Sequence, residues 1–252
     1  MSDSSVRVII DTTPHSGQWN MACDETLLIS ACDNNLCTFR WYLWEEATLS
    51  LGYFQKVEPS FFKNDRWATL PKVKRLSGGG AILHHHEITY SCALPATHPL
   101  AENPAKLYQK IHEQIIATLK KEGIQLHLRG EGKVTPHDPF LCFQRGDAND
   151  VIFEKHKVLG SAQRRRRGAL LQHGSLLLSK SKWAPEIPGI LDLVSLGFDS
   201  HKLLEKLAQA TVPILGEPDF EQPVTEKEKN CINHLIESRY RHLNWSSKKQ
   251  KT

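Results

Sequence analysis

The chain has 252 residues, of which 40% are apolar and 24% are charged, and its formal net charge is +4. This composition fits an ordinary globular chain with enough apolar residues for one large core or two small ones. No apolar run approaches the roughly 18 residues of a membrane helix, and the start, MSDSSVRVII, lacks the basic and apolar segments of a signal peptide. We therefore expect a cytoplasmic protein that does not bind membranes.

The chain contains six cysteines, and none of them belongs to a CxxC pair. They are Cys23, Cys32, Cys37, Cys92, Cys142 and Cys231. Scattered cysteines of this kind fit reduced thiols better than a disulfide framework or a zinc knuckle. One of them is therefore a candidate nucleophile.

In the first half of the chain, the predicted elements are a helix followed by three strands. The helix is predicted at residues 16–32, and the strands at residues 37–44, 48–55 and 87–94. The segment 48–55 also includes a turn. Ser16 is a suitable N-cap for the helix. The strands are predicted from alternation with a period of two, and Pro95 ends the last of them.

In the second half, a helix is followed by two or three strands and two more helices. The first helix is predicted at residues 107–119, the strands within residues 149–163 and 168–178, and the last two helices at residues 200–210 and 225–240. Apolar residues recur every four positions from Leu107 to Leu119, which predicts an amphipathic helix. Thr225 and Glu228 have the spacing of a capping box at the start of the last helix.

Alternating helices and strands, without repeats or low-complexity linkers, indicate an α/β fold of mixed sheets flanked by helices. The pattern becomes mostly helical beyond Pro188. We therefore expect residues 1–197 to form the main domain and residues 198–252 to form a helical C-terminal appendage packed on it.

The most unusual local sequence is KRLSGGGAILHHHEITYS, at residues 74–91. Three consecutive glycines, Gly78, Gly79 and Gly80, are costly inside a regular element, so they predict either a tight turn or a loop whose amides contact a ligand. Such amides, preceded by Arg75, would suit a phosphate, a carboxylate or a thioester carbonyl. The loop is neither a Walker loop nor a GxGxxG dinucleotide motif.

Three histidines, His84, His85 and His86, follow the glycines. Neighbouring side chains on an extended segment point to opposite faces, so the three cannot all ligate one ion. With no spaced carboxylate or cysteine to complete a ligand set, we expect no metal site. We expect His84 to line a pocket, and His85 with His86 to form a solvated turn.

Cys142 lies in the segment HDPFLCFQRGDANDV, whose prolines and polar residues indicate a loop. A lone cysteine is more often a small core residue than a nucleophile, and that alternative stays open. Functional residues are nevertheless enriched in loops, and a nearby lysine or arginine would favour the thiolate. Cys142 is thus the strongest candidate among the six cysteines.

Lys157 leads into the sequence VLGSAQ, in which Gly160, Ser161 and Ala162 add little side-chain bulk. A substrate could approach the backbone there while the ammonium reaches its carbonyl group or the Cys142 thiolate. The alternative is an ordinary charged residue at a strand edge, which is common on protein surfaces.

The segments RLSGGGAILH, KVLGSAQRRR and LLQHGSLLL together resemble, in this order, the lipoate/octanoate protein ligases and transferases. NMACDETLL, TLSLGYFQ and SRYRHLNW add supporting similarities, so the resemblance spans most of the chain. It implies a biotin/lipoyl-ligase catalytic domain, which is related to the catalytic domain of class II aminoacyl-tRNA synthetases.

The family attaches a medium-chain acid to a lysine of a lipoyl domain by one of two routes. Octanoyltransferases use a cysteine thioester and no cofactor, and Cys142 with Phe143 resembles the CF pair of the transferases that look like ligases. Ligases make an acyl-adenylate with ATP and Mg²⁺, and Asn149 with Asp150 resembles their ND pair. We favour transfer, keep the ligase as the alternative, and leave open an amidotransferase that moves lipoyl groups between proteins.

The resemblance implies that Cys142 and Lys157 are catalytic. It implies substrate contacts for Arg75, Ser77, Gly78, Gly79, Gly80, His84, Gly160, Ser161, Ala162 and His173. A hydrogen-bonded core residue is the alternative for His173, which alternates with apolar positions on its strand. The implied partners are octanoyl acyl carrier protein and the lipoyl domains of 2-oxoacid dehydrogenase E2 or glycine cleavage H protein.

Four arginines, Arg164 to Arg167, stand between two predicted strands. Beside the site they could steer acidic partner proteins, or they could form a solvated connection between the strands. A non-catalytic module that binds nucleic acid through these arginines and the six tryptophans is a third reading. A net charge of only +4 with a single basic cluster argues against that reading, so we expect no nucleic-acid partner.

Overall fold

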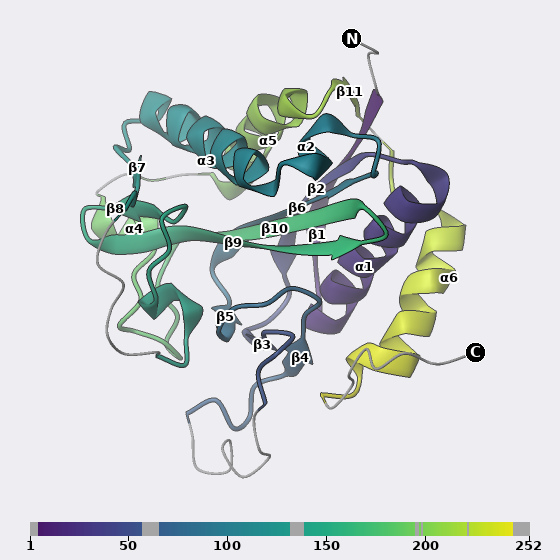
Figure 1. Cartoon of the computed structure of the whole chain (residues 1–252). Helices are drawn as coiled ribbons and strands as arrows, with labels where there is room; N and C mark the ends of the chain where they lie inside the picture. The colour runs from purple at the N-terminus through teal and green to yellow at the C-terminus, as the bar shows by residue number, and fades with distance from the viewer. Residues whose placement is uncertain are drawn as a thin grey trace.

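The computed structural model describes residues 5–56, 66–131, 139–194, 197, 199–220 and 222–243 (Figure 1). Two of the sequence features lie partly outside this set. They are the C-terminal similarity SRYRHLNW, whose last two residues are Asn244 and Trp245, and the predicted loop before Cys142, which includes Pro136. Among the described residues, no helix combines the length and apolar character that a membrane span requires.

A large mixed sheet forms the centre of the molecule (Figure 1). Its described strands are, in spatial order, β11 (Glu217–Asp219), β1 (Ser5–His15), β2 (Thr38–Trp44), β6 (Glu87–Leu94), β10 (Ala169–Leu177), β9 (His156–Arg166), β8 (Val151–Phe153) and β7 (His127–Leu128). Strand β1 is parallel to both of its neighbours, and the other pairs are antiparallel.

Helices cover both faces of this sheet, which confirms the predicted α/β class (Figure 1). They are α1 (Gly17–Asn34), α2 (Pro99–Glu102), α3 (Pro104–Lys121), α4 (Ile190–Leu193), α5 (Ser200–Thr211) and α6 (Glu226–Leu235). Helices α2, α3 and α5 share one apolar core with β2, β6 and β10. Helices α1 and α6 share a second core on the opposite face.

The helix predicted at residues 16–32 is α1, and Ser16 caps it by accepting a hydrogen bond from the amide of Trp19 at 3.3 Å. Several polar side chains of α1 are buried instead of solvated, among them Asn20, Asp24 and Glu25. Buried polar groups need partners, so these side chains are committed to hydrogen bonds and ion pairs with the sheet and its loops. They prove central to the arrangement of the site.

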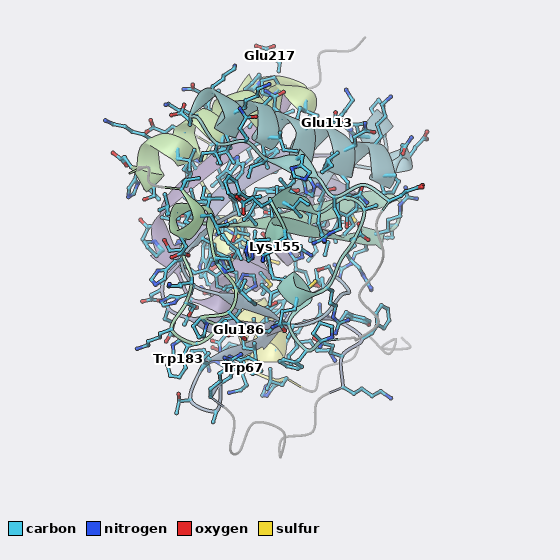
Figure 2. All side chains as sticks on the ribbon, turned by 90° about the vertical axis from the view of Figure 1, so that its left-hand side faces the viewer. Trp67, Glu113, Lys155, Trp183, Glu186 and Glu217 are labelled. Atoms are coloured by element: carbon cyan, nitrogen blue, oxygen red, sulfur yellow. The ribbon has the colours of Figure 1, made fainter. Side chains whose placement is uncertain are left out.

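A small sheet lies beside the large one, with the order β4 (Lys72–Lys74), β3 (Thr48–Leu51) and β5 (Ile82–His84). It has its own apolar cluster, to which Trp67 and the partly buried Trp183 belong. The indole of Trp67 donates to the carbonyl of Trp183 at 2.8 Å, and Figure 2 shows both close to Glu186. The glycine loop connects β4 to β5, so this sheet holds both of its ends.

The four arginines belong to the hairpin of β9 and β10. Arg164, Arg165 and Arg166 end β9, and Arg167 forms the turn with Gly168, both with positive φ as a two-residue hairpin requires. Successive side chains point to opposite faces of the strand. Arg165 accordingly donates to the carbonyl of Ala101 before α3, whereas Arg166 pairs with Glu25 of α1 at 2.7 Å.

The other two arginines also contact the chain itself. The guanidinium of Arg164 lies 4.6 Å from the ring centre of Tyr53, and Arg167 pairs with Asp33 at 2.5 Å. The run therefore fastens the hairpin to helices on both faces of the sheet. None of the readings of this run that the sequence suggested included these intramolecular contacts.

The C-terminal segment packs on the same cores as the rest of the chain. Leu203, Leu204 and Leu207 of α5 join the first core, and Ile232 and Leu235 of α6 join the second. Strand β11 also extends the large sheet. The division into residues 1–197 and an appendage of residues 198–252 remains a prediction, and the described residues on either side of it share their cores.

The capping box predicted at Thr225 and Glu228 is present at the start of α6. The Glu228 carboxylate also pairs with Arg7 of β1 at 2.7 Å, and both side chains are buried. Strand β1 was not predicted, although it carries this contact. Strands β4, β5, β7 and β11 and helix α2 were not predicted either, and all of them are short.

His112 joins α3 to the sheet close to the site. Its Nδ1–H donates to the carbonyl of Asn149 at 2.6 Å, since a carbonyl can only accept. Its Nε2 therefore accepts from the hydroxyl of Ser161 at 2.7 Å. Burial lowers the pKa of His112 to about 4, so the ring is neutral in the folded protein at pH 7.

This burial predicts a loss of stability in mild acid. Between pH 6.5 and about 4 the unfolded chain binds a proton at His112 that the folded chain does not, so the free energy of unfolding falls as the pH falls. A shift of this size corresponds to about 3 kcal/mol. Urea unfolding at pH 7 and pH 4.5 should show a smaller drop for His112→Gln than for the wild type. Equal drops would contradict the prediction.

Candidate active site

A cavity of about 450 Å³ opens between β9, β10, the glycine loop and the Cys142 loop. Of the residues predicted for the site, it is lined by Arg75, Gly78, Gly79, Gly80, His84, Cys142, Lys157, Gly160, Ser161, Ala162 and His173. Ser77 lies next to it and is bonded to His173. Segments that are far apart in the sequence thus meet at one cavity of a size usual for a small-molecule site.

The glycine loop is held in shape by Arg75, which is buried beneath it. One nitrogen of the guanidinium, Nη2, donates to the carbonyls of Gly78 and Gly80 at 2.7 Å each, and Nη1 donates to the carbonyl of Ser50 at 3.0 Å. Burial lowers the pKa of Arg75 to about 10, so the group stays charged near neutral pH. Arg75 therefore shapes the loop that lines the cavity.

The glycines are required by close contacts and by backbone conformation. Gly79 has a φ of +91°, which a residue with a side chain rarely adopts. A Cβ on Gly52 would lie 2.0 Å from the carbonyl oxygen of Gly79, and a Cβ on Gly80 would lie 2.7 Å from the guanidinium of Arg145. The close contacts and the positive φ fit the tight turn, which is one of the two predicted alternatives, and contact of the loop with a ligand stays a prediction.

Cys142 begins a short 3₁₀ helix, Cys142–Gln144, next to the glycine loop. Its amide donates to the carbonyl of Ala81 at 2.7 Å, and the amide of Ala81 donates to the carbonyl of Phe140 at 3.0 Å. A Cβ on Gly79 would lie 3.8 Å from the Cys142 sulfur. The backbone pairing thus places the thiol against the glycine loop, in the wall of the cavity.

The remaining cysteines lie outside this cavity. Cys23, Cys37 and Cys92 are buried in the two large cores. Burial raises the pKa of the Cys23 and Cys37 thiols to about 12, which suppresses thiolate formation. Cys32 and Cys231 are partly buried and pack against the second core. Cys142 is therefore the cysteine that a substrate in the cavity would meet.

The ammonium of Lys157 has Asp150 as its nearest polar contact. Nζ lies 2.7 Å from Oδ1 of Asp150 and 3.5 Å from the backbone carbonyl of Cys142, and it sits 5.2 Å from the ring centre of Phe143. The printed contact of Nζ is with the backbone carbonyl of Cys142, and an approach of Nζ to the thiol itself stays a prediction. A Cβ on Gly160 would lie 2.5 Å from Cε of Lys157, so the missing side chain leaves room for the lysine.

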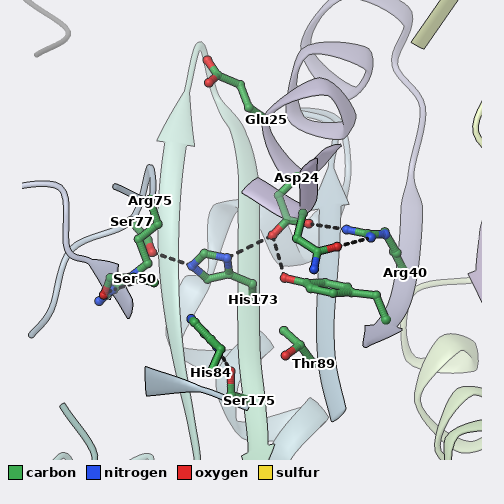
Figure 3. A network of polar contacts seen from close by, with 12 residues as sticks. Asp24, Glu25, Arg40, Ser50, Arg75, Ser77, His84, Thr89, His173 and Ser175 are labelled. Carbon is green, nitrogen blue, oxygen red and sulfur yellow. Dashed lines mark hydrogen bonds and ion pairs between the residues drawn. The ribbon is translucent and has the colours of Figure 1, made fainter. Parts of the chain in front are cut away.

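His173 connects the cavity wall to α1 (Figure 3). Its Nδ1–H donates to Oδ2 of Asp24 at 3.1 Å, and its Nε2 accepts from the hydroxyl of Ser77 at 2.5 Å. Asp24 also accepts from the hydroxyl of Tyr42 at 3.2 Å and pairs with Arg40 at 3.4 Å. Ser77, His173 and Asp24 are thus bonded in the order of a Ser-His-Asp triad. Ser77 is only 1% exposed, however, so this network holds the glycine loop to the sheet.

His84 occupies the expected place in the cavity wall. Its Nδ1–H donates to Glu87 at 2.8 Å, and its ring stacks on Trp44 at 3.8 Å between ring centres. Burial lowers the pKa of His84, which keeps the ring neutral near pH 7. His85 is partly buried and bonded to Ser181, whereas His86 is exposed. Among the described residues, no three His, Cys, Asp or Glu side chains are grouped as metal ligands.

Several residues of the site were not predicted from the sequence. The cavity is also lined by Met21, Tyr42, Thr89, Tyr108, Arg145 and Ser175. The resemblance implied no role for Asp24, which bonds His173, although Asp24 lies in the similar segment NMACDETLL. The sequence does contain a signal for this role: Asp24 is a polar residue in the mostly apolar run MACDETLL. A helix with this pattern buries an aspartate only where the carboxylate has a partner.

Comparison with known proteins supports the fold and the family. Two structures with similar folds are a lipoate-protein ligase A bound with ATP and an archaeal bipartite lipoate protein ligase from Thermoplasma acidophilum, solved in a study of that ligase and its E2 lipoyl domain. Their TM-scores are 0.72 and 0.69, at 20% and 19% identity. The first match covers 96% of this chain and 98% of the other, and the second covers 99% of each. At this identity the likeness concerns the fold.

The sequence relatives are more similar. An octanoyltransferase LipM of Clostridioides difficile is 36% identical over 175 residues, which are 68% of this chain and 65% of the relative. Another of Macrococcus caseolyticus is 32% identical over 212 residues, which are 81% of this chain and 74% of the relative. The chain thus spans about two thirds of the length of the curated relatives that it matches. Residues 16–184 match the model of the lipoyl protein ligase A/B catalytic domain, and the chain belongs to this family.

Proposed function

We propose that this protein is an octanoyltransferase that moves an octanoyl or lipoyl group from acyl carrier protein, through a thioester on Cys142, to a lysine of a lipoyl domain. One observation carries the proposal: the Cys142 thiol lines the same cavity as the glycine loop and Lys157. The names of the relatives support the same chemistry. A cysteine next to a cation and bare backbone is suited to nucleophilic acyl transfer.

In the first step the Cys142 thiolate attacks the carbonyl carbon of the acyl thioester. A new carbon–sulfur bond forms, the bond to the carrier sulfur breaks, and the carrier thiolate leaves and takes up a proton. The ammonium of Lys157 lies beside the backbone of Cys142, where its charge favours the anionic states of this step. The glycine loop lies against the thiol, since a Cβ on Gly79 would be 3.8 Å from the sulfur, so the reacting carbonyl would lie beside this loop.

In the second step the amine of the acceptor lysine attacks the new thioester. The carbon–nitrogen bond forms, the bond to Cys142 breaks, and the proton lost by the amine is available to the departing thiolate. The acyl chain occupies the inner cavity, whose walls include Met21, Ile82 and Tyr42. No cofactor takes part in either step.

The ligase alternative requires groups for ATP and Mg²⁺, and the resemblance assigns Asn149 and Asp150 to that part of the site. Oδ1 of Asp150 contacts Lys157, and its Oδ2 accepts from the amide of Asp147 at 2.8 Å. Asp147 in turn accepts from the amide of Asn149 at 2.9 Å. Both members of the ligase-like ND pair thus make contacts within the described part of the chain, and the ligase stays the alternative.

The rim of the cavity offers a surface for the acidic partner proteins. Phe54 is 77% exposed and lies beside Gly78, since a Cβ on Gly78 would be 3.8 Å from its ring. The neighbouring ring of Tyr53 is contacted by the cations of Lys74 and Arg164. Exposed aromatic and cationic groups suit a docking site for carrier protein or a lipoyl domain of E2 or H protein.

Cys142→Ala tests the proposed function directly. With octanoyl acyl carrier protein, an unmodified lipoyl domain and no ATP, the wild type should gain a transient octanoyl adduct and acylate the domain. The variant should do neither, because it lacks the attacking sulfur, and intact-mass spectrometry measures both products. Cys231→Ala, outside the cavity, should behave as the wild type. An adduct that persists in Cys142→Ala would refute the assignment, and activity that requires ATP would indicate a ligase.

Gly160→Ala tests the placement of Lys157. The added Cβ would come within 2.5 Å of Cε and 2.9 Å of Nζ, so the ammonium must move. We expect acyl transfer to fall about 100-fold, the order of loss that a displacement of about 1 Å causes. Single-turnover kinetics measure the loss. Gly197→Ala, whose Cβ would meet no atom of the described residues within 4 Å, is the control, and equal rates for the two variants would contradict the prediction.

A further inference from the structure

Asp150 makes the closest polar contact of the catalytic lysine. Its Oδ1 lies 2.7 Å from Nζ of Lys157, and each side chain is only 5% exposed. The pair lines the same cavity as Cys142. A buried charge is stable only when it is paired, so each of the two groups depends on the other.

The Asp150 carboxylate is itself held in a fixed orientation. Its Oδ2 accepts from the amide of Asp147 at 2.8 Å and lies 3.6 Å from Nε of Arg129. The backbone of Asp150 is also bonded on both sides, because its amide donates to the carbonyl of Asp147 and its carbonyl accepts from Arg129. Burial raises the pKa of Asp150, and the charge of Lys157 opposes that rise.

Within the described part of the chain, Lys157 has few other contacts that restrain its long side chain. Beyond Asp150, its ammonium contacts the backbone carbonyl of Cys142 at 3.5 Å and the face of the Phe143 ring. Both of these contacts are weaker than a short ion pair. The Asp150 carboxylate therefore fixes the position of the Lys157 ammonium, which lies beside the backbone of Cys142.

We propose that Asp150 is a positioning residue of the transferase, which aims the Lys157 ammonium at the thioester carbonyl beside Cys142. This inference rests on the proposed function and extends it from a Cys–Lys pair to a Cys–Lys–Asp set. It also gives the ND pair a role in a transferase: the aspartate binds the lysine. The carboxylate does not touch the substrate, and it acts through Lys157.

Asp150→Asn is the first test. It keeps the shape of the side chain and an oxygen for the amide of Asp147, but it removes the charge that holds Lys157. We expect formation of the octanoyl-enzyme to slow about 10- to 100-fold, because the ammonium loses its position. Alkylation of Cys142 by iodoacetamide should slow much less than octanoyl-enzyme formation, since alkylation does not need an ammonium aimed at a carbonyl. Asp199→Asn, which keeps a good N-cap for α5, is the matched control.

A double-mutant cycle separates positioning from general damage. If Asp150 acts through Lys157, then Asp150→Asn should cause no further loss in a Lys157→Met background. Losses that multiply in the double variant would overturn the proposal, as would wild-type rates of octanoyl-enzyme formation in Asp150→Asn. A wild type that forms no octanoyl-enzyme would overturn the proposed function itself, and with it this role.

Asp150→Asn leaves a buried ammonium without its ion-pair partner, so its folding is checked by circular dichroism and melting temperature. Should it not fold, Asp150→Glu provides the same test, because it keeps the charge and displaces the carboxylate by one methylene. We then expect a slower first acyl transfer with normal iodoacetamide alkylation. A first transfer at the wild-type rate in the folded Glu variant would overturn the proposal.

Discussion

The arrangement of the site depends on one buried guanidinium, that of Arg75. A loop of three glycines has no side chains to fix it, and its carbonyls would be costly to bury without partners. Arg75 bonds two of these carbonyls and also reaches Ser50 in the neighbouring strand β3. The loop thereby gains a single shape, in which Gly79 adopts its positive φ next to the Cys142 sulfur.

A second constraint joins this loop to the cysteine loop. Ala81 and Leu141 form an isolated parallel bridge, and both side chains are buried in the small apolar cluster beneath them. Cys142, the proposed nucleophile, therefore lies on a loop whose backbone is hydrogen-bonded to the glycine loop and whose Leu141 packs in this cluster. Such support holds a catalytic side chain more precisely than a free loop could.

The local sequence was sufficient to predict many of the larger elements. Helix α3 was predicted from apolar residues spaced by four, and strands β2, β6, β9 and β10 from their apolar alternation or runs. Strand β1 was missed, although VRVII is a strand-like run. Its partners β2 and β11 are parallel to it, and such pairs lack the hairpin turns that make neighbouring antiparallel strands recognisable.

The sequence by itself determined which residue types were available for chemistry: a cysteine in a polar loop, a lysine before small residues and a run of glycines. Only the tertiary structure decided how these groups are paired. It gave Lys157 an aspartate as its nearest partner, His173 a network with Asp24 and Ser77, and the arginine run a set of intramolecular contacts. The physical reason is that ion pairs and hydrogen bonds act over a few ångströms, and packing alone brings residues distant in sequence to that range.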